Sequence, residues 1–313
     1  MVLAAALAAG AVLAAVTVRG LVSSSKAPAA RRATGAVELS ALEGRPSAIA
    51  VGGGQVWLPD DQRGLVVRLD ADHGRFTGPP VPVGPTPVAA AFGEGSVWVA
   101  DANGSVTHID PARGAVVGQP IQVGGSLSGI AVGAGAVWVA DLQRGTLTRI
   151  DPATGSPRQP VRIPEGAVRV AVDDGDVWVT NSDHTVTKID PASQRIVATV
   201  DAGRGPIGLA VARGTVWVTN SDDDTVSRLD EDTGRALGPP VPVGRAPVAV
   251  AVDGDEVWVL DQDDRTLTRL TRTGRQVGRP IGLGTRPRGL AVGASGVWVA
   301  GVDPGAAVLV RRR

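Results

Sequence analysis

Short hydrophobic runs alternate with polar residues along most of the chain, and glycine-rich or proline-containing turns separate the runs. In one stretch, SGIAV at residues 128–132 is followed by AVWVA at 136–140, TLTRID at 146–151 and a proline-containing run at 160–163. Short runs of this kind predict β-strands, and the tight turns between them join antiparallel neighbours. The proline indicates that the fourth strand lies at an outer edge. The pattern predicts a four-stranded antiparallel sheet and has no helical period.

The pattern recurs seven times, and each copy carries the phrase valine–tryptophan–hydrophobic residue. All tryptophans of the chain lie in this phrase, 39 to 41 residues apart, at Trp57, Trp98, Trp138, Trp178, Trp217, Trp258 and Trp298. A period near 40 residues is typical of one blade of a β-propeller. The sequence therefore predicts an all-β fold, a seven-bladed β-propeller of four-stranded antiparallel blades over residues 36–313. We expect the tryptophans to pack between neighbouring blades rather than to stack on a ligand.

The two ends of the repeat region predict how the ring closes. After Trp298 the chain has room for only one more strand, at residues 306–310, whereas an extra run, AVELSAL, precedes the first copy at residues 36–42. We expect this N-terminal run to form the outer strand of the last blade, because that pairing removes an exposed sheet edge. A column of small residues on the innermost strands indicates crowding near the central axis: Ala50, Ala91, Ala131, Ala171, Ala210, Ala251 and Ala291.

An apolar segment precedes the repeats. Residues 2–18 carry no charge, so we expect residues 1–22 to form one apolar helix, a transmembrane or signal segment, followed by a flexible linker at 23–35. This organisation predicts a membrane-anchored protein with an extracytoplasmic propeller, or a secreted one. Four basic residues follow the segment and none precedes it. The positive-inside rule would then place the propeller in the cytoplasm, unless the native chain extends upstream. Both interpretations stay open.

Composition narrows the classes of partner. The chain has 31 basic and 31 acidic residues and a formal net charge of zero, which argues against a nucleic-acid partner. It has no cysteine, which excludes disulfides, thiolate metal ligands, a thiol nucleophile and a lipid-modified N-terminal cysteine.

A polar residue stands three positions after almost every tryptophan. The column comprises Asp60, Asp101, Asp141, Asn181, Asn220 and Asp261, and Gly301 interrupts it. These side chains could ring one face as a cation site. We expect instead that each caps its own loop by accepting backbone N–H bonds. No ordered spacing typical of a calcium loop is present, so no metal site is predicted.

Arginines gather in the loops that join the fourth strand of one blade to the first strand of the next. These loops should share one face with the loops that follow the tryptophans, and we call this face the mouth. Its arginines are Arg45, Arg204, Arg245, Arg286 and Arg288. Guanidinium groups bind carboxylates and phosphates. The alternative, which we favour, is that they pair with neighbouring loop aspartates on a solvated rim.

One copy departs from the repeat. Before the fourth blade the usual linker becomes IPEGAVR, which contains Glu165 and Arg169, and Arg169 occupies a column otherwise filled by Gly or Ala. The loop after Trp178 in this copy holds Asp183 and His184. We expect these side chains to share one face of one blade. A histidine near a carboxylate is a candidate acid–base pair, because imidazole titrates near neutrality.

Residues 216–243 read VWVTNSDDDTVSRLDEDTGRALGPPVPV and lead into GRAPVAVAV. This stretch resembles the YVTN family of bacterial β-propeller repeats, with Trp at the Tyr position, and is similar to the repeats of streptogramin lyases of the virginiamycin B lyase type. The resemblance covers residues 36–313. It implies the propeller fold and, for the lyases, eliminative opening of a cyclic lactone with histidine, glutamate and magnesium. Related propellers are extracytoplasmic sensor domains behind a membrane helix.

Three functions remain, of which the third is a purely structural interaction platform. The favoured one is a non-enzymatic extracytoplasmic binding or sensor module for a small ligand or protein partner; the alternative is a streptogramin lyase-like C–O lyase or hydrolase acting at the mouth. The chain has three histidines, and His108 on a third strand and His73 on the opposite face should not reach the mouth. For the favoured function we expect no catalytic residue; for an enzyme, His184 and Glu165 are the best pair.

The predicted ligand-binding residues are Arg169, Asp183, His184, Arg204, Arg245, Arg286 and Arg288. We expect no cofactor, with magnesium only under the lyase alternative, and a monomeric propeller.

Overall fold

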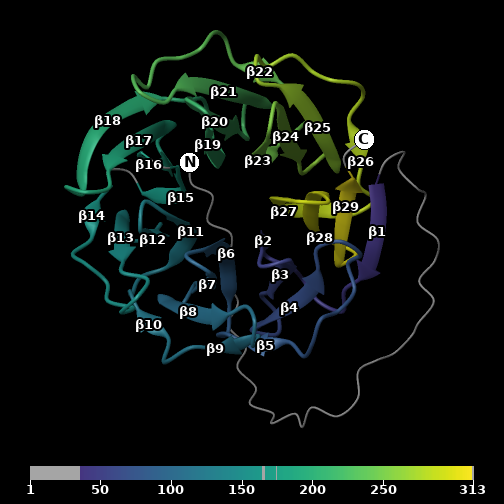
Figure 1. The fold of residues 1–313 in the computed structure, drawn as a ribbon. Coiled ribbons are helices and arrows are strands. Elements are labelled where there is room, and N and C mark those ends of the chain that lie inside the picture. Colours follow the sequence, from purple (N-terminus) through teal and green to yellow (C-terminus); the bar gives the residue numbers. More distant parts are fainter. Residues whose placement is uncertain (1–35, 164–165, 174, 312–313) are drawn as a thin grey trace.

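Seven antiparallel β-sheets surround a central axis in the computed structural model, which describes residues 36–163, 166–173 and 175–311 (Figure 1). Each sheet is one blade, with its first strand nearest the axis and its fourth strand at the periphery (Figure 1). We number the blades one to seven in the order of their tryptophans. The predicted seven-bladed propeller of four-stranded antiparallel blades is confirmed.

The first four blades follow one another along the chain. Blade one contains β2 (Ala50–Gly52), β3 (Gln55–Asp60), β4 (Leu65–Asp70) and β5 (Val81–Pro82). Blade two contains β6 (Pro87–Gly93), β7 (Ser96–Asp101), β8 (Ser105–Asp110) and β10 (Ile121–Gln122), with an additional short strand β9 (Ala115–Val116) paired to β8. Blade three contains β11 (Leu127–Gly133), β12 (Ala136–Asp141), β13 (Thr146–Ile150) and β14 (Val161–Arg162). Blade four contains β15 (Ala167–Val172), β16 (Val177–Asn181), β17 (Thr185–Asp190) and β18 (Arg195–Asp201).

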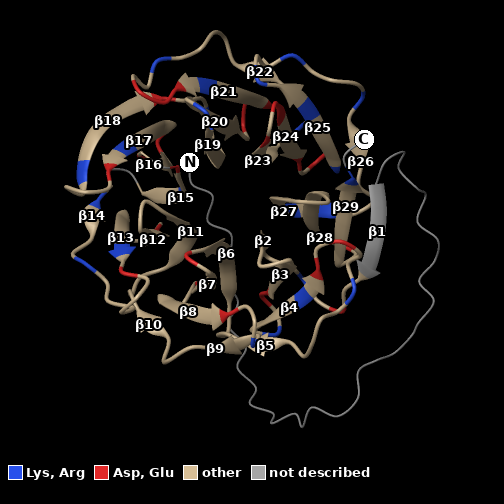
Figure 2. Ribbon diagram, in the orientation of Figure 1, with Lys and Arg blue, Asp and Glu red and all other residues tan. Residues whose placement is uncertain are grey.

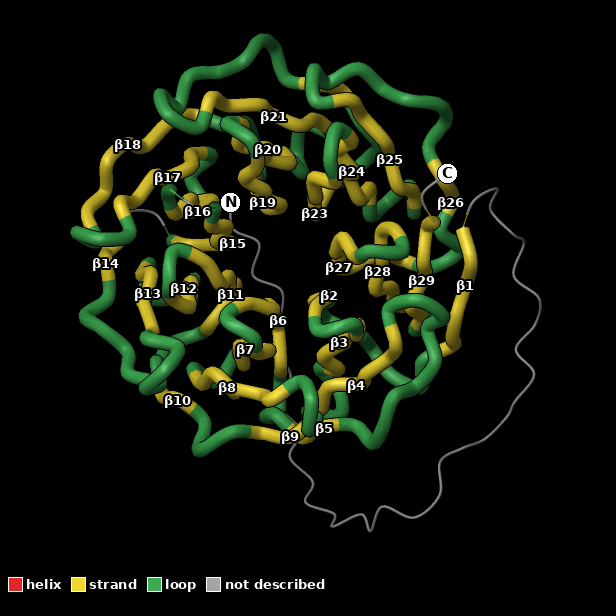
Figure 3. Tube along the Cα trace, in the orientation of Figure 1, coloured by secondary structure: helices red, strands yellow, loops and turns green. Residues whose placement is uncertain are grey.

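The remaining blades complete the ring. Blade five contains β19 (Pro206–Ala212), β20 (Thr215–Asn220), β21 (Thr225–Asp230) and β22 (Val241–Pro242). Blade six contains β23 (Pro247–Asp253), β24 (Glu256–Asp261), β25 (Thr266–Thr271) and β26 (Ile281–Gly282). Blade seven contains β27 (Arg286–Gly293), β28 (Gly296–Val302), β29 (Ala306–Arg311) and β1 (Ala36–Ala41). Most fourth strands are only two residues long, and loops run around the outside of the ring (Figure 3).

The two ends of the propeller meet in blade seven. Strand β1 pairs antiparallel with β29, from Ala36 opposite Val310 to Ala41 opposite Ala306. Leu42 then donates its N–H to the carbonyl of Gly305 at 2.9 Å. The predicted closure is therefore confirmed, and the outer edge of the last blade is covered by a strand from the other end of the propeller.

The tryptophans form the core between blades. All seven indoles are buried, and Trp138 of blade three packs in one cluster with Val170 and Val179 of blade four. Each alanine of the small column lies directly opposite a tryptophan, as Ala131 does opposite Trp138. We expected crowding at the axis to explain these alanines. The register gives another reason: cross-strand partners share one face of a sheet, so a small residue leaves room for the indole.

A cation covers most of the indoles from the third strand. The guanidinium of Arg149 lies 6.0 Å from the ring centroid of its cross-strand partner Trp138. Arg68, Lys188, Arg228 and Arg269 are placed in the same way in blades one, four, five and six. Such cation–π contacts stabilise each blade from inside.

The predicted apolar helix at residues 1–22 and the linker at 23–35 lie outside the described residues. Within the described ranges, no helix has the length and apolar character needed to cross a bilayer.

Candidate functional site

A cavity of about 160 Å³ lies on the axis of the propeller. Residues on or just before the first strands of all seven blades line it. The lining is apolar except for Ser47, Arg169 and Arg288. Strands β2, β6, β11 and β19 bring no charged residue to the axis (Figure 2). The side chains around the cavity are thus mostly apolar, and two cationic side chains lie among them.

Arg169 enters the cavity from β15 of blade four. Its backbone N–H donates to the Thr180 hydroxyl at 3.1 Å, and its Nη1 donates to the carbonyls of Ser128 and Val168. A Cβ at Gly129 of the preceding blade would lie 3.1 Å from the Arg169 Cα, so the glycine permits this close approach of the two strands. Burial lowers the pKa of Arg169 from its ordinary value, because the charged form loses hydration.

Arg288 reaches the cavity from β27 of blade seven. Blades four and seven are three positions apart in a ring of seven, so strands β15 and β27, which carry the two arginines, lie on opposite sides of the axis (Figure 1). The Nε of Arg288 is buried without a hydrogen-bond partner in the described part of the chain. No carboxylate oxygen of the described residues lies within 4.0 Å of the guanidinium of Arg169 or Arg288.

Two rim arginines have a carboxylate partner instead. Nε of Arg204 lies 2.8 Å from Oδ1 of Asp223, and Nε of Arg245 lies 2.7 Å from Oδ1 of Asp264. In both pairs the aspartate also accepts the backbone N–H of the arginine, at 2.8 Å. These N–H bonds and the guanidinium lower the pKa of Asp223 and of Asp264, and the hydrogen bond that Arg245 donates to Asp264 raises the pKa of Arg245. The predicted pairing of mouth arginines with loop aspartates is confirmed here.

Arg286 and Arg45 lie elsewhere on the mouth. Arg286 donates from Nη2 to Oε1 of Gln262 at 3.1 Å and stands 3.9 Å from Oδ1 of Asp263. Arg45 contributes its backbone carbonyl, which accepts the N–H of Asp61 at 3.3 Å. Neither guanidinium lines the axial cavity.

His184 lies on the mouth, in the exposed turn between β16 and β17, with a left-handed φ of 76°. Its Nδ1 accepts the N–H of Gly205 at 3.3 Å, which brings it next to the Arg204 linker. Asp183 is directed away from this ring, because its Oδ1 accepts the hydroxyl of Thr185 at 2.6 Å. Glu165 lies outside the described residues, so its pairing with His184 stays a prediction.

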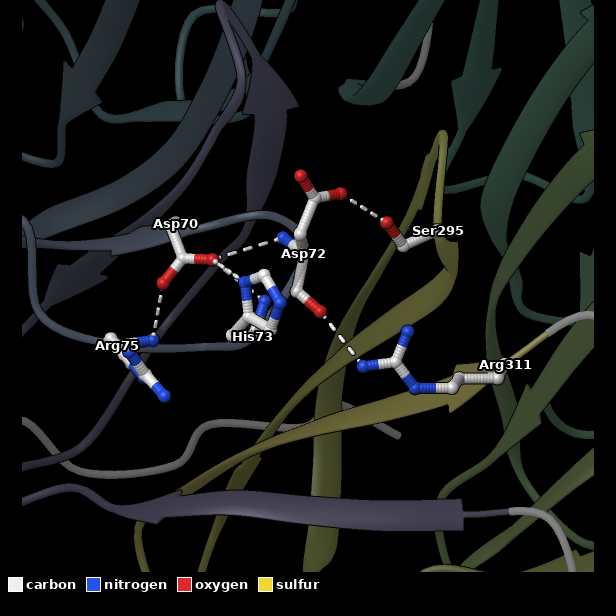
Figure 4. Close-up of polar contacts among 6 residues, drawn as sticks. All are labelled: Asp70, Asp72, His73, Arg75, Ser295 and Arg311. Atoms are coloured by element: carbon white, nitrogen blue, oxygen red, sulfur yellow. Dashed lines mark hydrogen bonds and ion pairs between the residues drawn. The ribbon is translucent and has the colours of Figure 1, made fainter.

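The other two histidines have local partners. His108 stacks on Trp98 with ring centroids 4.1 Å apart, its Nε2 lies 2.8 Å from the Ser96 hydroxyl, and burial lowers its pKa. His73 lies in the turn after β4, where its Nδ1 contacts Oδ1 of Asp70 at 3.2 Å (Figure 4). The same turn contacts blade seven through Asp72, whose side chain accepts a hydrogen bond from Ser295 (Figure 4). Neither ring is part of the cavity wall.

The polar column after the tryptophans caps loops in blades one to three. Asp60 accepts the N–H of Gln62 at 3.0 Å within its own loop. Asp101 accepts the N–H of Asn103 at 2.9 Å and, across the mouth loops, that of Thr86 at 2.8 Å. Asp141 behaves in the same way towards Arg144 and Ser126. The predicted capping role is confirmed for these blades.

Blades four to six use the same position differently. Nδ2 of Asn220 donates to the hydroxyls of Thr225 and Ser227 on the third strand, at 3.0 and 2.9 Å, and Asn181 makes the corresponding contacts in blade four. Asp261 accepts the hydroxyls of Thr266 and Thr268 at 3.0 and 2.6 Å, and burial raises its pKa to about 6. No group of three or more His, Asp or Glu side chains suited to a metal ion occurs among the described residues.

The glycine of the linker fits against this polar column, which the sequence reasoning missed. A Cβ at Gly84 would lie 2.4 Å from Oδ2 of Asp101, and a Cβ at Gly244 would lie 2.6 Å from Cγ of Asp261. In blade seven the order is reversed: Gly301 stands at the column position and faces Thr285 of the linker. Two features of the sequence could have indicated this fit. A glycine recurs after valine in the linker, and glycine replaces the polar residue of the column once, at Gly301.

Known proteins share this fold. The chain matches the family described as outer membrane protein assembly factor BamB over residues 102–197 and 143–289, together more than half its length. No curated protein sequence matches it. Virginiamycin B lyase from Staphylococcus aureus superposes with a TM-score of 0.77 at 17% identity, covering 89% of this chain and 98% of that one.

Two further solved structures share the fold. A streptogramin B lyase superposes with a TM-score of 0.76 at 17% identity, covering 88% of this chain and 97% of that one. The WD40 propeller domain of Doa1 gives 0.74 at 12% identity, with coverage of 88% and 96%. The predicted resemblance to streptogramin lyases is therefore confirmed at the level of the fold.

Proposed function

The chain belongs to the family described as outer membrane protein assembly factor BamB, and from this membership and the cavity on its axis we propose that it is a non-enzymatic binding module. Its axial cavity takes a ligand, and the propeller acts as a rigid support or sensor. The family description, an assembly factor, names a role in association rather than in chemistry.

The observation that carries this proposal is the contrast between the mouth and the cavity. The aspartates and asparagines of the mouth, and the rim arginines Arg204 and Arg245, are engaged in hydrogen bonds or ion pairs that hold the loops. Arg169 and Arg288 line the axial cavity, among mostly apolar side chains, without a carboxylate partner among the described residues. A concave apolar space with a few convergent polar groups is the usual form of a small-ligand site.

A location outside the cytoplasm is part of the proposal. It is supported by the apolar residues 2–18 and by the description of the family as an outer-membrane factor. The absence of cysteine fits either compartment.

Thermal unfolding of the full chain in the presence of ligands tests the proposal. The seven buried tryptophans provide the fluorescence signal, and the ligands are divalent cations, sugars, small organic acids, inorganic phosphate and cyclic depsipeptides. A ligand at one hundred times its Kd stabilises the folded state by about 2.7 kcal/mol. We expect a Tm rise of several degrees with one class, and mass spectrometry afterwards should find that ligand intact. No rise with any class, or a consumed ligand, contradicts a non-enzymatic ligand-binding module.

A lyase of the streptogramin type is the second candidate, and His184 on the mouth is the observation that favours it. Incubation with a streptogramin B depsipeptide and magnesium tests it. Turnover that His184→Ala abolishes, and that the matched control His73→Ala on the opposite face retains, would establish the enzyme. Intact depsipeptide after prolonged incubation would remove this candidate.

A further inference from the structure

The cavity contains two positive charges that the fold itself does not require. Arg169 occupies a column that holds Ala or Gly in every other blade. Arg288 occupies a column that holds Ser or an aliphatic residue elsewhere: Ser47, Val88, Ser128, Val168, Ile207 and Val248. The repeats serve as internal controls, because six blades close the axis without a charge at each position. Something other than blade packing must account for both arginines.

Their environment makes the charges costly. Both side chains are half-buried, and a charge that is partly withdrawn from water without a counter-charge is unfavourable. Backbone carbonyls of Ser128 and Val168 accept from Nη1 of Arg169, but a guanidinium has five N–H donors. The guanidinium of Arg288 has no carboxylate within 4.0 Å among the described residues. Both arginines thus line the cavity without a counter-charge in the described part of the chain.

We propose that the axial cavity binds a small oxyanion, a carboxylate or phosphate group, between Arg169 and Arg288. The planar guanidinium fork matches the geometry of both groups. Both arginines line this one cavity, from blades on opposite sides of the ring. This proposal rests on the proposed binding function and names the chemistry of its ligand.

The volume of the cavity suits a small anion. It is about 160 Å³, below the roughly 300 Å³ or more of pockets for drug-sized ligands. Inorganic phosphate and short organic acids are therefore the first probes.

Calorimetric titration of the full chain tests the proposal, with inorganic phosphate and succinate as separate probes in a chloride buffer. The two probes distinguish a phosphate ligand from a carboxylate ligand. We expect one of them to bind, and Arg169→Gln and Arg288→Gln each to weaken its Kd about tenfold or more, because each removes a charge-assisted hydrogen-bonding partner. The control Arg204→Gln with Arg245→Gln removes two rim cations and should leave the Kd within about twofold.

A second measurement separates binding from a structural role. Arg169→Met, with its fold checked by tryptophan fluorescence, should raise Tm in anion-free buffer, because it replaces a buried charge by an apolar chain. A lowered Tm for Arg169→Met together with unchanged anion binding by Arg288→Gln would overturn the proposal.

Two further outcomes are distinguishable. If neither anion binds while a neutral ligand raises Tm, the oxyanion site is wrong and the proposed binding function is retained. If no ligand of any class binds, the oxyanion site and the proposed binding function are both wrong.

Discussion

Blades one to three and blades four to six place a polar residue at the same position after the tryptophan and use it for different purposes. In the first group the carboxylate of Asp101 or Asp141 accepts backbone N–H groups and joins two mouth loops. In the second group Asn220 or Asp261 turns inward to two hydroxyls of the third strand. Both arrangements use the side chain to hold neighbouring elements together, whereas the axial arginines have no carboxylate partner among the described residues.

The third strand partly explains the difference. Blade one has Leu65 and Val67 where blade six has Thr266 and Thr268, so its carboxylate has no hydroxyl to meet. Blade three has threonines at the corresponding positions, yet Asp141 still caps the loops. A pair of hydroxyls is therefore necessary for the second arrangement but not sufficient.

The largest effect should come from removing a cap in the first group. Asp101→Ala leaves the N–H groups of Thr86 and Asn103 without their acceptor, at roughly 2 kcal/mol each. We expect a loss of about 4 kcal/mol in the free energy of unfolding by urea titration. A loss below about 1 kcal/mol would show that water replaces the cap and that the two groups of blades are not different in this respect.

Asp261→Asn should raise the free energy of unfolding rather than lower it, and the size of the increase should depend on pH. Burial raises the Asp261 pKa from 3.8 to about 6, so the folded state holds this proton more tightly than the unfolded state. The contribution of the Asp261 carboxyl to the free energy of unfolding is complete below about pH 4, falls as the pH rises to about 6, and is lost above that pH. Two pKa units correspond to about 3 kcal/mol as an upper value.

Asn stands at the same position in blade five and serves two hydroxyls there, so the variant at position 261 should be more stable than the wild type at pH 8 and similar to it at pH 4. Urea titrations of both proteins at the two pH values measure the difference. An equal difference at both pH values would contradict the raised pKa.

The reciprocal substitution, of Asn220 by aspartate, is expected to change the free energy of unfolding somewhat less. Asn220→Asp places a carboxylate between Thr225 and Ser227, and we expect a loss of about 2 kcal/mol at pH 8, because the buried charge costs free energy. The loss should shrink as pH falls towards 4, when the new carboxyl is protonated. Asn220→Leu, which has no charge at any pH, is the matched control and should show a loss that does not change with pH.

The smallest effect belongs to the rim. Arg204→Gln removes an exposed ion pair with Asp223 and should change Tm by no more than about 2 °C, with less difference at high salt. A larger change in Tm would mean that the rim ion pairs stabilise the mouth loops. The pairs of blades five and six would then have the same structural role as Asp101 in blade two.

The sequence predicted the parts of the fold that repeat. The tryptophan spacing and the extra run at residues 36–42 gave the blade number and the closure, because both depend on counting strands. The cap at Asp101 was predictable from residue type and loop position. The inward rotation of Asn220 and Asp261 was not, because it depends on side chains brought opposite by the register.

The candidate site was predicted less completely. The sequence singled out Arg169 as a departure and grouped Arg288 with the rim arginines. The structure places Arg288 at the axis with Arg169, away from the rim arginines. The first strands of blades four and seven have a register shift near their start, between Ala167 and Arg169 and between Pro287 and Gly289. This shift changes which side chains reach the axis. Arg204 pairs with Asp223, and Arg245 pairs with Asp264. The two residues of each pair are 19 positions apart, so the spacing in the sequence could have identified the partners.

The most direct test of the binding account is to observe the arginine side chains themselves. Nuclear magnetic resonance of the full chain, labelled with nitrogen-15 at arginine Nε and assigned with Arg169→Gln, Arg288→Gln, Arg204→Gln and Arg245→Gln, would follow each Nε–H signal during titration with phosphate or succinate. The account predicts saturable shifts for Arg169 and Arg288 and none for Arg204 and Arg245. Shifts confined to the rim pair, or no shift at the axis with either anion, would contradict it.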